Sequence, residues 1–260
     1  MADHSDSTPP PNSPSDGSPA FSAFARMEGL LDHGRISDLH GVMRWGSNYA
    51  ALVTVSDGDL KRTAVYKPQR GERPLWDFPD GTLCMREVMA YVISQATGWG
   101  LVPPTVLRDG PHGLGSLQLF IEHDPDVNYF SLDDSFVDQL RCYVLFDYVI
   151  NNADRKGGHL LLDDKGKLWG IDHGLTFHSM PKLRTVIWEF AGQKVDAALL
   201  APIQKMYERL LCADDDLRAS IEKLLSAVEV TALIRRIKQL LDCQTYPTPG
   251  PGPNHPWPPV

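Results

Sequence analysis

Two acidic residues with small and basic neighbours are the first candidates for chemistry in this sequence. Asp154 is followed two positions later by Lys156 and five positions later by His159, and a second acid, Asp172, lies two residues before Gly174. Phosphoryl transfer needs a carboxylate that orients a hydroxyl, groups that hold divalent cations on phosphates, and a cation that offsets the developing charge. The spacing therefore predicts a phosphotransfer site. Asp154 is the expected base and Lys156 its neighbouring cation, and we expect His159 and Asp172 to be metal ligands.

The first half of the chain offers side chains that suit the phosphates of a nucleotide. Lys67 ends an apolar stretch, where kinases place the lysine that reaches the α- and β-phosphates. Glu87 is the only carboxylate in a helix predicted over 82–97, and it lies on an apolar row of that helix. Because a buried carboxylate needs a cation, we expect Glu87 to pair with Lys67 at the nucleotide.

Two further segments are candidates for nucleotide contact. Gly46, Ser47 and Asn48 precede a predicted strand and suit a loop that covers phosphates with its backbone N–H groups. Gln118 and Leu119 lie in the strand that would lead into the connector between two lobes, where backbone groups would meet the adenine edge. A surface turn and an ordinary core strand would have the same residue types, so both interpretations stay open.

These residues require elements on two sides of a cleft. Before residue 122 the apolar pattern is mostly that of strands, and from Asp133 onward it follows the helical period of 3.6 residues. Beyond a helix ending near residue 151, a short hairpin over 160–171 leads to Asp172, and a capping box at Ser226 to Glu229 opens the last helix. The predicted strands cover 48–55, 60–67, 104–108 and 116–122, and helices are predicted over 22–32 and 82–97. The fold class expected is α+β, with a β-rich N-lobe and a helical C-lobe.

Proline marks the limits of the folded part. Five of the 21 prolines lie in the first twenty residues and seven in the last fourteen. Such segments bury too little apolar surface to offset the entropy of ordering them. We predict a disordered tail over 1–20, the N-lobe over 21–122, the C-lobe over 123–243 and a disordered Pro-rich tail over 244–260. The Pro-rich tails are either plain tails or polyproline ligands for a protein partner.

Composition excludes several classes of protein. The chain has 260 residues, a formal net charge of −8 and 42% hydrophobic residues, which is ordinary globular usage. An acidic chain is a poor binder of nucleic acid or anionic lipid, and no run approaches the ~18 apolar residues of a membrane span. The four cysteines form no Cys-x-x-Cys pair, and the N-terminus lacks the features of a secretory signal. We expect a cytoplasmic protein without membrane insertion.

Together these motifs resemble the bacterial phosphatidylinositol 3- and 4-kinase-like family, which is related to HipA-type kinases. The resemblance is clearest over 42–175 and is carried by Ala64-Val-Tyr-Lys67-Pro68, Arg86-Glu87, Leu117-Gln-Leu-Phe120, Asn151-Asn-Ala-Asp-Arg-Lys-Gly-Gly-His159 and Gly170-Ile-Asp-His-Gly174. It implies a two-lobed protein-kinase-like fold with ATP and Mg²⁺ or Mn²⁺ in the cleft. It also implies Lys67 and Glu87 on the nucleotide, Asp154 as base and Asp172 on the metal. As the phosphate acceptor we expect a hydroxyl of a protein or small molecule.

Two departures from that family keep other functions open. His159 stands where lipid kinases and HipA-type kinases carry asparagine, and imidazole favours Mn, Zn or Fe over Mg. Lys156 stands where lipid kinases have histidine, so a lipid acceptor is not favoured. One alternative is a pseudokinase that binds nucleotide without transferring phosphate. A second is a metal-dependent hydrolase built from Asp154, His159, Asp172, His173 and His178.

Overall fold

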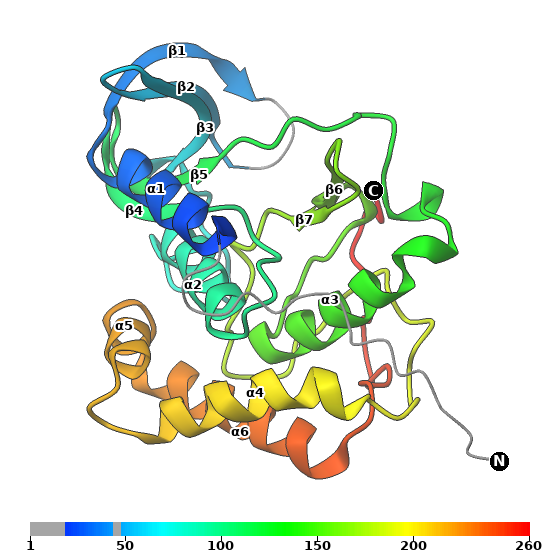
Figure 1. The fold of residues 1–260 in the computed structure, drawn as a ribbon. Coiled ribbons are helices and arrows are strands. Elements are labelled where there is room, and N and C mark those ends of the chain that lie inside the picture. Colours follow the sequence, from blue (N-terminus) through cyan, green and yellow to red (C-terminus); the bar gives the residue numbers. More distant parts are fainter. Residues whose placement is uncertain (1–18, 44–47) are drawn as a thin grey trace, which may run out of the picture.

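A computed structural model describes residues 19–43 and 48–260 of the chain as two lobes (Figure 1). The first lobe is built on an antiparallel sheet, and the second consists mainly of helices. Gly46 and Ser47, two of the expected phosphate-loop residues, lie outside the described residues, as do residues 1–18 of the predicted N-terminal tail. Within the described ranges, no helix combines the length and the apolar character needed to cross a membrane.

The N-lobe sheet has five strands in the order β1-β2-β3-β5-β4. The strands are β1 (Arg35–Met43), β2 (Ala50–Asp57), β3 (Leu60–Pro68), β4 (Thr105–Gly110) and β5 (Gly113–Leu119). Alternating side chains point to one face, where they are buried against the helix α1 (Pro19–His33). That small core consists of Leu30, Leu31, Val53, Val55, Ala64, Tyr66 and Leu117.

The edge strand β1 is absent from the sequence-based expectation. Its pairing with β2 shifts register between Ser37 and Leu39 and again between Leu39 and Gly41. Asp38 has φ 49° and Gly41 has φ 141°, so both depart from extended backbone. Because each bulge interrupts the alternation of inward and outward side chains, the period-2 pattern that identifies a strand is lost here.

Helix α2 (Leu83–Ala96) lies between the sheet and the helical lobe (Figure 1). Its apolar residues, including Met89 and Ile93, belong to the same buried cluster as the C-lobe helices, whereas the sheet has its separate core. Arg86 is 1% exposed; it donates to the carbonyl of Thr176 and pairs with Glu229 of the last helix. Helix α2 falls within the N-lobe range predicted from the sequence; it packs against β4 and β5 of the sheet and against helices of the C-lobe, and its buried apolar residues belong to the cluster shared with the C-lobe.

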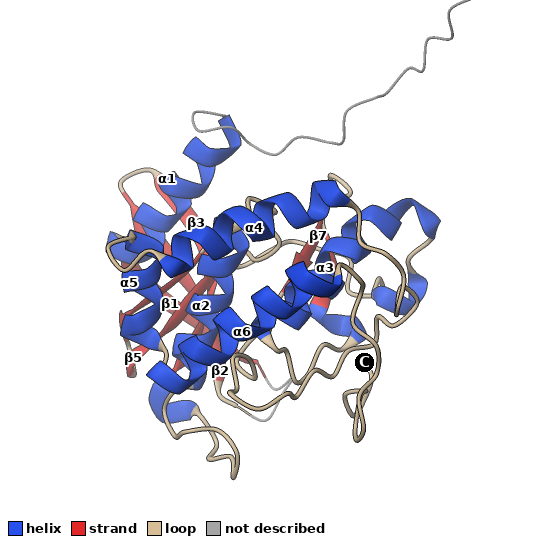
Figure 2. Cartoon of the chain, turned by 90° about the horizontal axis from the view of Figure 1, so that it is seen from below, coloured by secondary structure: helices blue, strands red, loops and turns tan. Residues whose placement is uncertain are grey.

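The C-lobe begins with α3 (Val137–Ile150), which ends where Asn151 adopts φ 52° in the left-handed region. The hairpin of β6 (Leu160–Leu162) and β7 (Leu168–Gly170) follows, as predicted. Three helices complete the lobe, namely α4 (Ala197–Leu211), α5 (Asp216–Leu224) and α6 (Ala227–Cys243). The capping box of Ser226 and Glu229 is present at the start of α6. In Figure 2 the helices α3, α4 and α6 lie side by side.

The C-terminal Pro-rich segment, residues 244–260, differs from the predicted disordered tail. Tyr246 is 1% exposed and exchanges backbone hydrogen bonds with the segment at Gly192 and Gln193. Farther along, the carbonyl of Asn254 accepts from Trp188 Nε1 at 3.1 Å, and the carbonyl of Pro259 accepts from the Gly157 N–H at 2.7 Å. Proline has no backbone N–H donor but keeps its carbonyl acceptor. A Pro-rich segment can therefore be held by N–H groups of other segments, which its composition does not reveal.

Candidate active site

Three charged side chains from both lobes meet at one point. Lys67 lies near the end of β3, and its Nζ donates to Glu87 of α2 and, at 2.9 Å, to Asp172 Oδ1. Glu87 is 3% exposed, and its second carboxylate oxygen accepts the backbone N–H of His173 at 2.9 Å. The expected Lys67–Glu87 pair is therefore present, and the residues far apart in the chain that were expected to share a nucleotide site are in direct contact.

The charges at this point stabilise one another. Burial would lower the pKa of Lys67, but the carboxylates of Asp172 and Glu87 outweigh that effect and raise it above its usual value. Lys67 in turn holds the pKa of Asp172 well below the ordinary range. Asp172 also has φ 60°, a left-handed conformation that is unusual for a residue with a side chain. Near neutral pH the site thus presents a permanent ammonium beside an ionised carboxylate.

Asp154 lies in the loop between α3 and the hairpin. Its backbone N–H donates to Asn152 Oδ1 at 3.0 Å, and its side chain, 26% exposed, lies 3.9 Å from Lys156 Nζ. Burial raises the pKa of Asp154 to about 6, with Lys156 opposing the shift. A carboxyl group with this pKa is ionised at neutral pH yet basic enough to accept a proton, which suits a general base.

His159 lies next to Asp172, with 3.4 Å between Nε2 and the carboxylate Oδ2. Burial lowers the pKa of His159 to about 4, so the ring is neutral near pH 7 and does not add a positive charge beside Asp172. Its Nδ1 accepts the Lys156 N–H at 3.4 Å, which leaves the ring hydrogen on Nε2. Metal ligation through Nε2 would require that hydrogen to move to Nδ1, at the loss of only one long hydrogen bond.

The donor set fits a divalent cation that also binds phosphates. Among the described ranges, no three His, Cys, Asp or Glu side chains converge on a potential metal position. Asp172 and His159 supply two neighbouring donors at most. Mg²⁺ in nucleotide sites is characteristically held by one or two protein ligands, while phosphate oxygens and waters complete the shell. The residues present therefore fit a cation carried with a nucleotide better than a metal held by protein alone.

The predicted hydrolase cluster is not formed. His173 is fully buried, with Nε2 2.7 Å from Arg155 Nη2, and His178 lies against the ring of Phe78 with 5.3 Å between centroids. Neither imidazole is part of a metal-binding group among the residues described. The geometry thus removes the arrangement on which the hydrolase alternative depended.

A buried ion pair that the sequence analysis did not identify holds the loop in place. Arg155 and Asp147 are both 0% exposed, and Arg155 donates to both oxygens of Asp147. Arg155 Nη1 also donates to the carbonyls of His159 and Ile171 at 3.3 Å, so one guanidinium connects α3, the loop and both ends of the hairpin. The available signal was an acidic residue, Asp147, within the otherwise apolar second half of α3, residues 142–150.

The side chain of Gln118 lies on the same face of the sheet as Lys67, because its partner on β3 is Val65, two residues before Lys67, but it is held by a neighbouring strand. It is 7% exposed, and its Nε2 donates to Thr105 Oγ1 at 2.8 Å inside the sheet. The N–H of Leu119 donates to the carbonyl of Pro104 at 2.9 Å, so that donor is already used. Asn48 Oδ1 accepts the Arg73 N–H at 2.8 Å and so ties the start of β2 to the loop before α2. Contact of these residues with a nucleotide stays a prediction.

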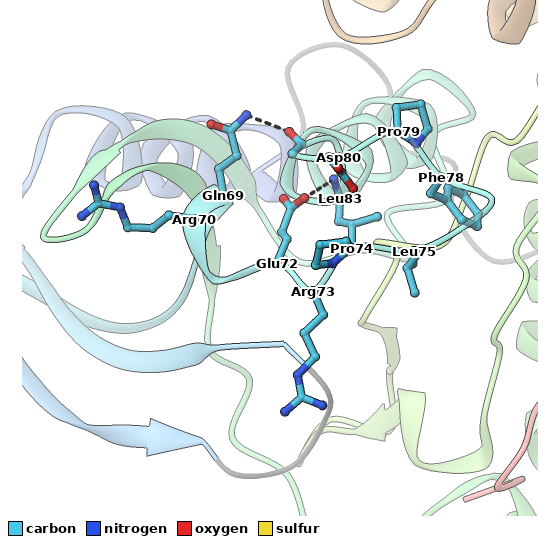
Figure 3. A pocket seen from close by; sticks show the side chains of 11 residues that line it. Gln69, Arg70, Glu72, Arg73, Pro74, Leu75, Phe78, Pro79, Asp80 and Leu83 are labelled. Carbon is cyan, nitrogen blue, oxygen red and sulfur yellow. Dashed lines mark hydrogen bonds between the residues drawn. The ribbon is translucent and has the colours of Figure 1, made fainter.

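The loop between β3 and α2 encloses a small cavity of about 210 Å³ (Figure 3). Gln69 Nε2 donates to the carbonyl of Gly81 at 2.7 Å, and Glu72 accepts the first N–H groups of α2, those of Leu83 and Cys84, at 3.0 and 2.8 Å. Small-molecule sites usually exceed ~300 Å³. The cavity is therefore too small to hold a nucleotide. The hydrogen bonds accepted by Glu72 instead fix the start of α2, the helix that carries Glu87.

Comparison with known proteins agrees with this geometry. The sequence profile of the family described as phosphatidylinositol 3- and 4-kinase matches residues 107–236, half of the chain, which include Asp154 and Asp172. Protein Rv2133c of Mycobacterium tuberculosis is 38% identical over 88% of this chain and 94% of its own length. Phosphatidylinositol 4-kinase gamma 4 of Oryza sativa subsp. japonica is 30% identical over 36% of this chain, which spans only 20% of that protein.

Solved structures of kinase-like proteins share the fold. The proinflammatory kinase CtkA of Helicobacter pylori aligns with a TM-score of 0.50 at 12% identity, over 83% of this chain and 94% of that one. The hydra Fam20 structure with sugar aligns with a TM-score of 0.50 at 16% identity, over 87% and 89% of the two chains. The prediction of an α+β, protein-kinase-like fold is confirmed. By its profile match over half of its length, the chain belongs to the phosphatidylinositol 3- and 4-kinase family.

Proposed function

We propose that the protein is an ATP-dependent phosphotransferase that moves the γ-phosphate to a hydroxyl of a protein or small molecule. The observation that carries the proposal is the contact of Lys67 with Glu87 and, at 2.9 Å, with Asp172, reached from the opposite lobe. A buried acid holds the amine in place, and an ionised acid stands where a cation would bridge it to phosphates.

Each side chain has a distinct role in this proposal. Lys67, held by Glu87, binds the α- and β-phosphates, and Asp172 with His159 holds Mg²⁺ or Mn²⁺. When bound, that cation neutralises charge on the phosphates. Asp154 accepts the proton of the acceptor hydroxyl as its oxygen bonds to the γ-phosphorus and the bond to the ADP oxygen breaks. Lys156 lies close enough to offset negative charge as it develops.

The nucleotide base is proposed to bind where the sheet gives way to the connector after β5. The N–H of Phe120 still donates to the carbonyl of Thr63, but beyond it the chain leaves the sheet. We place the adenine edge against the backbone from Leu119 onward and retain Gln118 as a residue that shapes the sheet beneath it. A phosphate-covering role for Gly46, Ser47 and Asn48 belongs to the same proposal.

A pseudokinase is the second candidate, because the neutral ring of His159 directs Nε2–H toward Asp172. In that arrangement the carboxylate accepts a hydrogen bond that competes with a metal ion. The protein would then bind nucleotide and act through binding alone.

Binding and transfer are tested separately. ATP with Mg²⁺ or Mn²⁺ at ~100 times Kd should stabilise the native state by about 2.7 kcal/mol, seen as a rise in melting temperature. Lys67→Met should abolish the shift, whereas Lys61→Met, an exposed lysine on the same strand, should keep it. Labelled ATP then reports transfer, which Asp154→Asn should lower by a factor of at least ~10², within the usual range for loss of a general base. A shift without transfer would support the pseudokinase, and the absence of any shift would contradict both candidates.

Other expectations accompany this proposal. We continue to predict a relation to HipA-type kinases, a cytoplasmic location and no nucleic-acid partner. A protein partner for the Pro-rich ends also stays a prediction for residues 1–18, which lie outside the described residues.

A further inference from the structure

The last residues of the described chain lie along the loop that carries Asp154. The N–H of Gly157 donates to the carbonyl of Pro259 at 2.7 Å, and the N–H of Thr185 donates to the carbonyl of Asn254 at 3.1 Å. Arg155 and Thr185 are bridge partners, so both donors belong to one small patch of paired backbone. We call residues 155–158 with 184–188 the loop-side surface. It begins one residue after the proposed base.

The loop-side surface recognises main chain. Three donors of this surface form hydrogen bonds to residues 254–260, and all three meet backbone carbonyls: the N–H of Gly157 bonds to Pro259, and the N–H of Thr185 and the indole Nε1–H of Trp188 share the carbonyl of Asn254. One side-chain contact is added by the rings of Trp188 and His255, with 6.5 Å between centroids. A Cβ at Gly157 would lie 2.8 Å from the Phe130 ring but 3.5 Å, an ordinary contact distance, from the carbonyl oxygen of Pro259. Glycine at this position is therefore required by the packing of Phe130, and the C-terminal segment is held by the hydrogen bond from the Gly157 N–H. Main-chain donors that meet main-chain acceptors are the hallmark of binding to an extended polypeptide.

Residues 254–260, the segment that occupies the loop-side surface, supply the carbonyl acceptors that its N–H donors require. Pro256, Pro258 and Pro259 offer carbonyls without competing N–H groups. Pro256 is buried, while Trp257 next to it is 89% exposed, so attachment does not depend on the largest side chain. The side chain of Asn254 closes the preceding turn, with hydrogen bonds to the N–H and carbonyl of Gly250 and to the carbonyl of Gly252.

We propose that the loop-side surface binds an extended segment of a polypeptide acceptor, and that residues 254–260 occupy it as an internal competitor. The catalytic meaning of this inference rests on the proposed function, because only a base at Asp154 makes a neighbouring polypeptide an acceptor. The binding of a polypeptide to the loop-side surface does not rest on the proposed function. Since the competitor is tethered at an effective concentration that reaches the millimolar range, loosening it should expose the surface to peptides in solution.

The first test measures binding without nucleotide in the full-length chain. A fluorescent peptide with the sequence of residues 252–260 is titrated into three proteins: wild type, Asn254→Ala and Pro253→Ala. Pro253→Ala is the matched control, because Pro253 is an exposed neighbour that makes no hydrogen bond through its side chain. We expect Asn254→Ala to bind the peptide at least fivefold more tightly than the other two. In Asn254→Ala, hydrogen exchange at the amides of Gly157 and Thr185 should also accelerate and slow again on adding peptide. Equal affinities in all three proteins, with unchanged exchange, would overturn the inference.

A second variant tests the surface rather than the tail. Trp188→Phe keeps an aromatic ring but removes the indole donor, so in the Asn254→Ala background it should weaken peptide binding severalfold. Thermal unfolding checks that the variant is folded. Undiminished binding by a folded double variant would overturn the assignment of Trp188 to the surface.

The catalytic arm separates this inference from the proposed function. With labelled ATP, Asn254→Ala should phosphorylate dephosphorylated casein several times faster than wild type. Vesicles of phosphatidylinositol in phosphatidylcholine should show no such gain. Peptide binding without any transfer would support the surface and contradict the proposed function. Transfer to lipid alone, or transfer to casein that is equal in wild type and Asn254→Ala, would overturn the polypeptide class of the acceptor.

Discussion

At the scale of single residues, opposite balances of burial and charge set the pKa values of the proposed base, Asp154, and of the proposed nucleotide lysine, Lys67. For Asp154, burial outweighs the cation at Lys156 and the pKa rises to about 6. For Lys67, two carboxylates outweigh burial, so the amine keeps its proton. Each side chain is therefore held in the protonation state that phosphoryl transfer requires of it near neutral pH.

The raised pKa of Asp154 predicts how stability depends on pH. A carboxyl group whose pKa is about 6 in the native state and about 3.9 in the unfolded chain destabilises the fold when ionised. This cost is absent below about pH 4, grows between pH 4 and 6, and is complete above pH 6. Asp154→Asn should therefore stabilise the protein by up to about 2–3 kcal/mol at pH 8 and by almost nothing at pH 4, measured by urea unfolding. A gain that is equal at both pH values would contradict the raised pKa.

The pKa of about 6 for Asp154 also predicts how phosphate transfer depends on pH. Because the base works only when ionised, and the pKa of about 6 belongs to the protein without bound substrate, kcat/KM for transfer should fall about tenfold per pH unit below pH 6 and level off above it. The profile is measured over the pH range in which the protein stays folded by circular dichroism. A kcat/KM that stays constant from pH 7 down to pH 5 would remove Asp154 from the role of base.

His159→Asn should change the metal preference of the protein. An amide oxygen suits Mg²⁺ better than imidazole does, so the ratio of activity with Mg²⁺ to activity with Mn²⁺ should rise severalfold. His33→Asn, 81% exposed in its side chain at the end of α1, is the matched control and should leave the ratio unchanged. Activity that appears only in His159→Asn would identify the natural protein as a pseudokinase. If His159→Asn changes neither the activity nor the ratio of activity with Mg²⁺ to activity with Mn²⁺, the side chain at position 159 is not a metal ligand.

At the scale of elements, the loop that carries Asp154 is held by a buried charge in addition to its backbone hydrogen bonds with residues 175 and 184–186. Arg155 reaches α3 through Asp147 and both ends of the hairpin through backbone carbonyls. A buried pair of this kind is costly to form, but once formed it specifies a single arrangement of its partners.

Removing one member of that pair should destabilise the whole protein. Arg155→Met leaves Asp147 buried without its cation, so we expect a loss of about 3–5 kcal/mol in the free energy of unfolding. Lys238→Met, which breaks an exposed pair on α6 whose side chains are 59% and 64% exposed, should leave the free energy of unfolding almost unchanged. Replacing both members, Asp147→Leu with Arg155→Met, should recover part of the loss. Equal effects of the two single changes would contradict the structural role of Arg155.

The elements found from the sequence are those with strong local patterns. Helix α2, the hairpin and the capping box of α6 follow from apolar periodicity and turn residues, and Asp154, Lys67 and Glu87 follow from type and spacing. Strand β1 was missed because two bulges break its alternation. Arg155 was missed because its partner lies in another element, and the binding of residues 254–260 depends on donors at Gly157 and Thr185 that no local pattern reveals.

At the scale of the whole molecule, the acidic balance bears on the acceptor. A net charge of −8 repels anionic surfaces, and the Debye length of about 8 Å at physiological salt leaves only close cationic contacts effective. Family membership therefore does not by itself make a lipid headgroup the acceptor of this chain.

This charge predicts weak binding to membranes. In sedimentation at 150 mM salt, vesicles of phosphatidylcholine with one-fifth phosphatidylinositol should retain no more protein than pure phosphatidylcholine vesicles. Strong retention that disappears at high salt would reveal a local basic surface and would favour a lipid acceptor.

The placement of α2 also determines which parts of the molecule can move together. Its apolar face is shared with α3 to α6, and Arg86 fastens it to Thr176 and Glu229, while the strands keep a core of their own. Helix α2 also packs against β4 and β5, so it contacts both the sheet and the helical lobe. A displacement of the sheet relative to α2 would separate Lys67 on β3 from Glu87, so an intact Lys67–Glu87 pair requires that the strands keep their position on this helix.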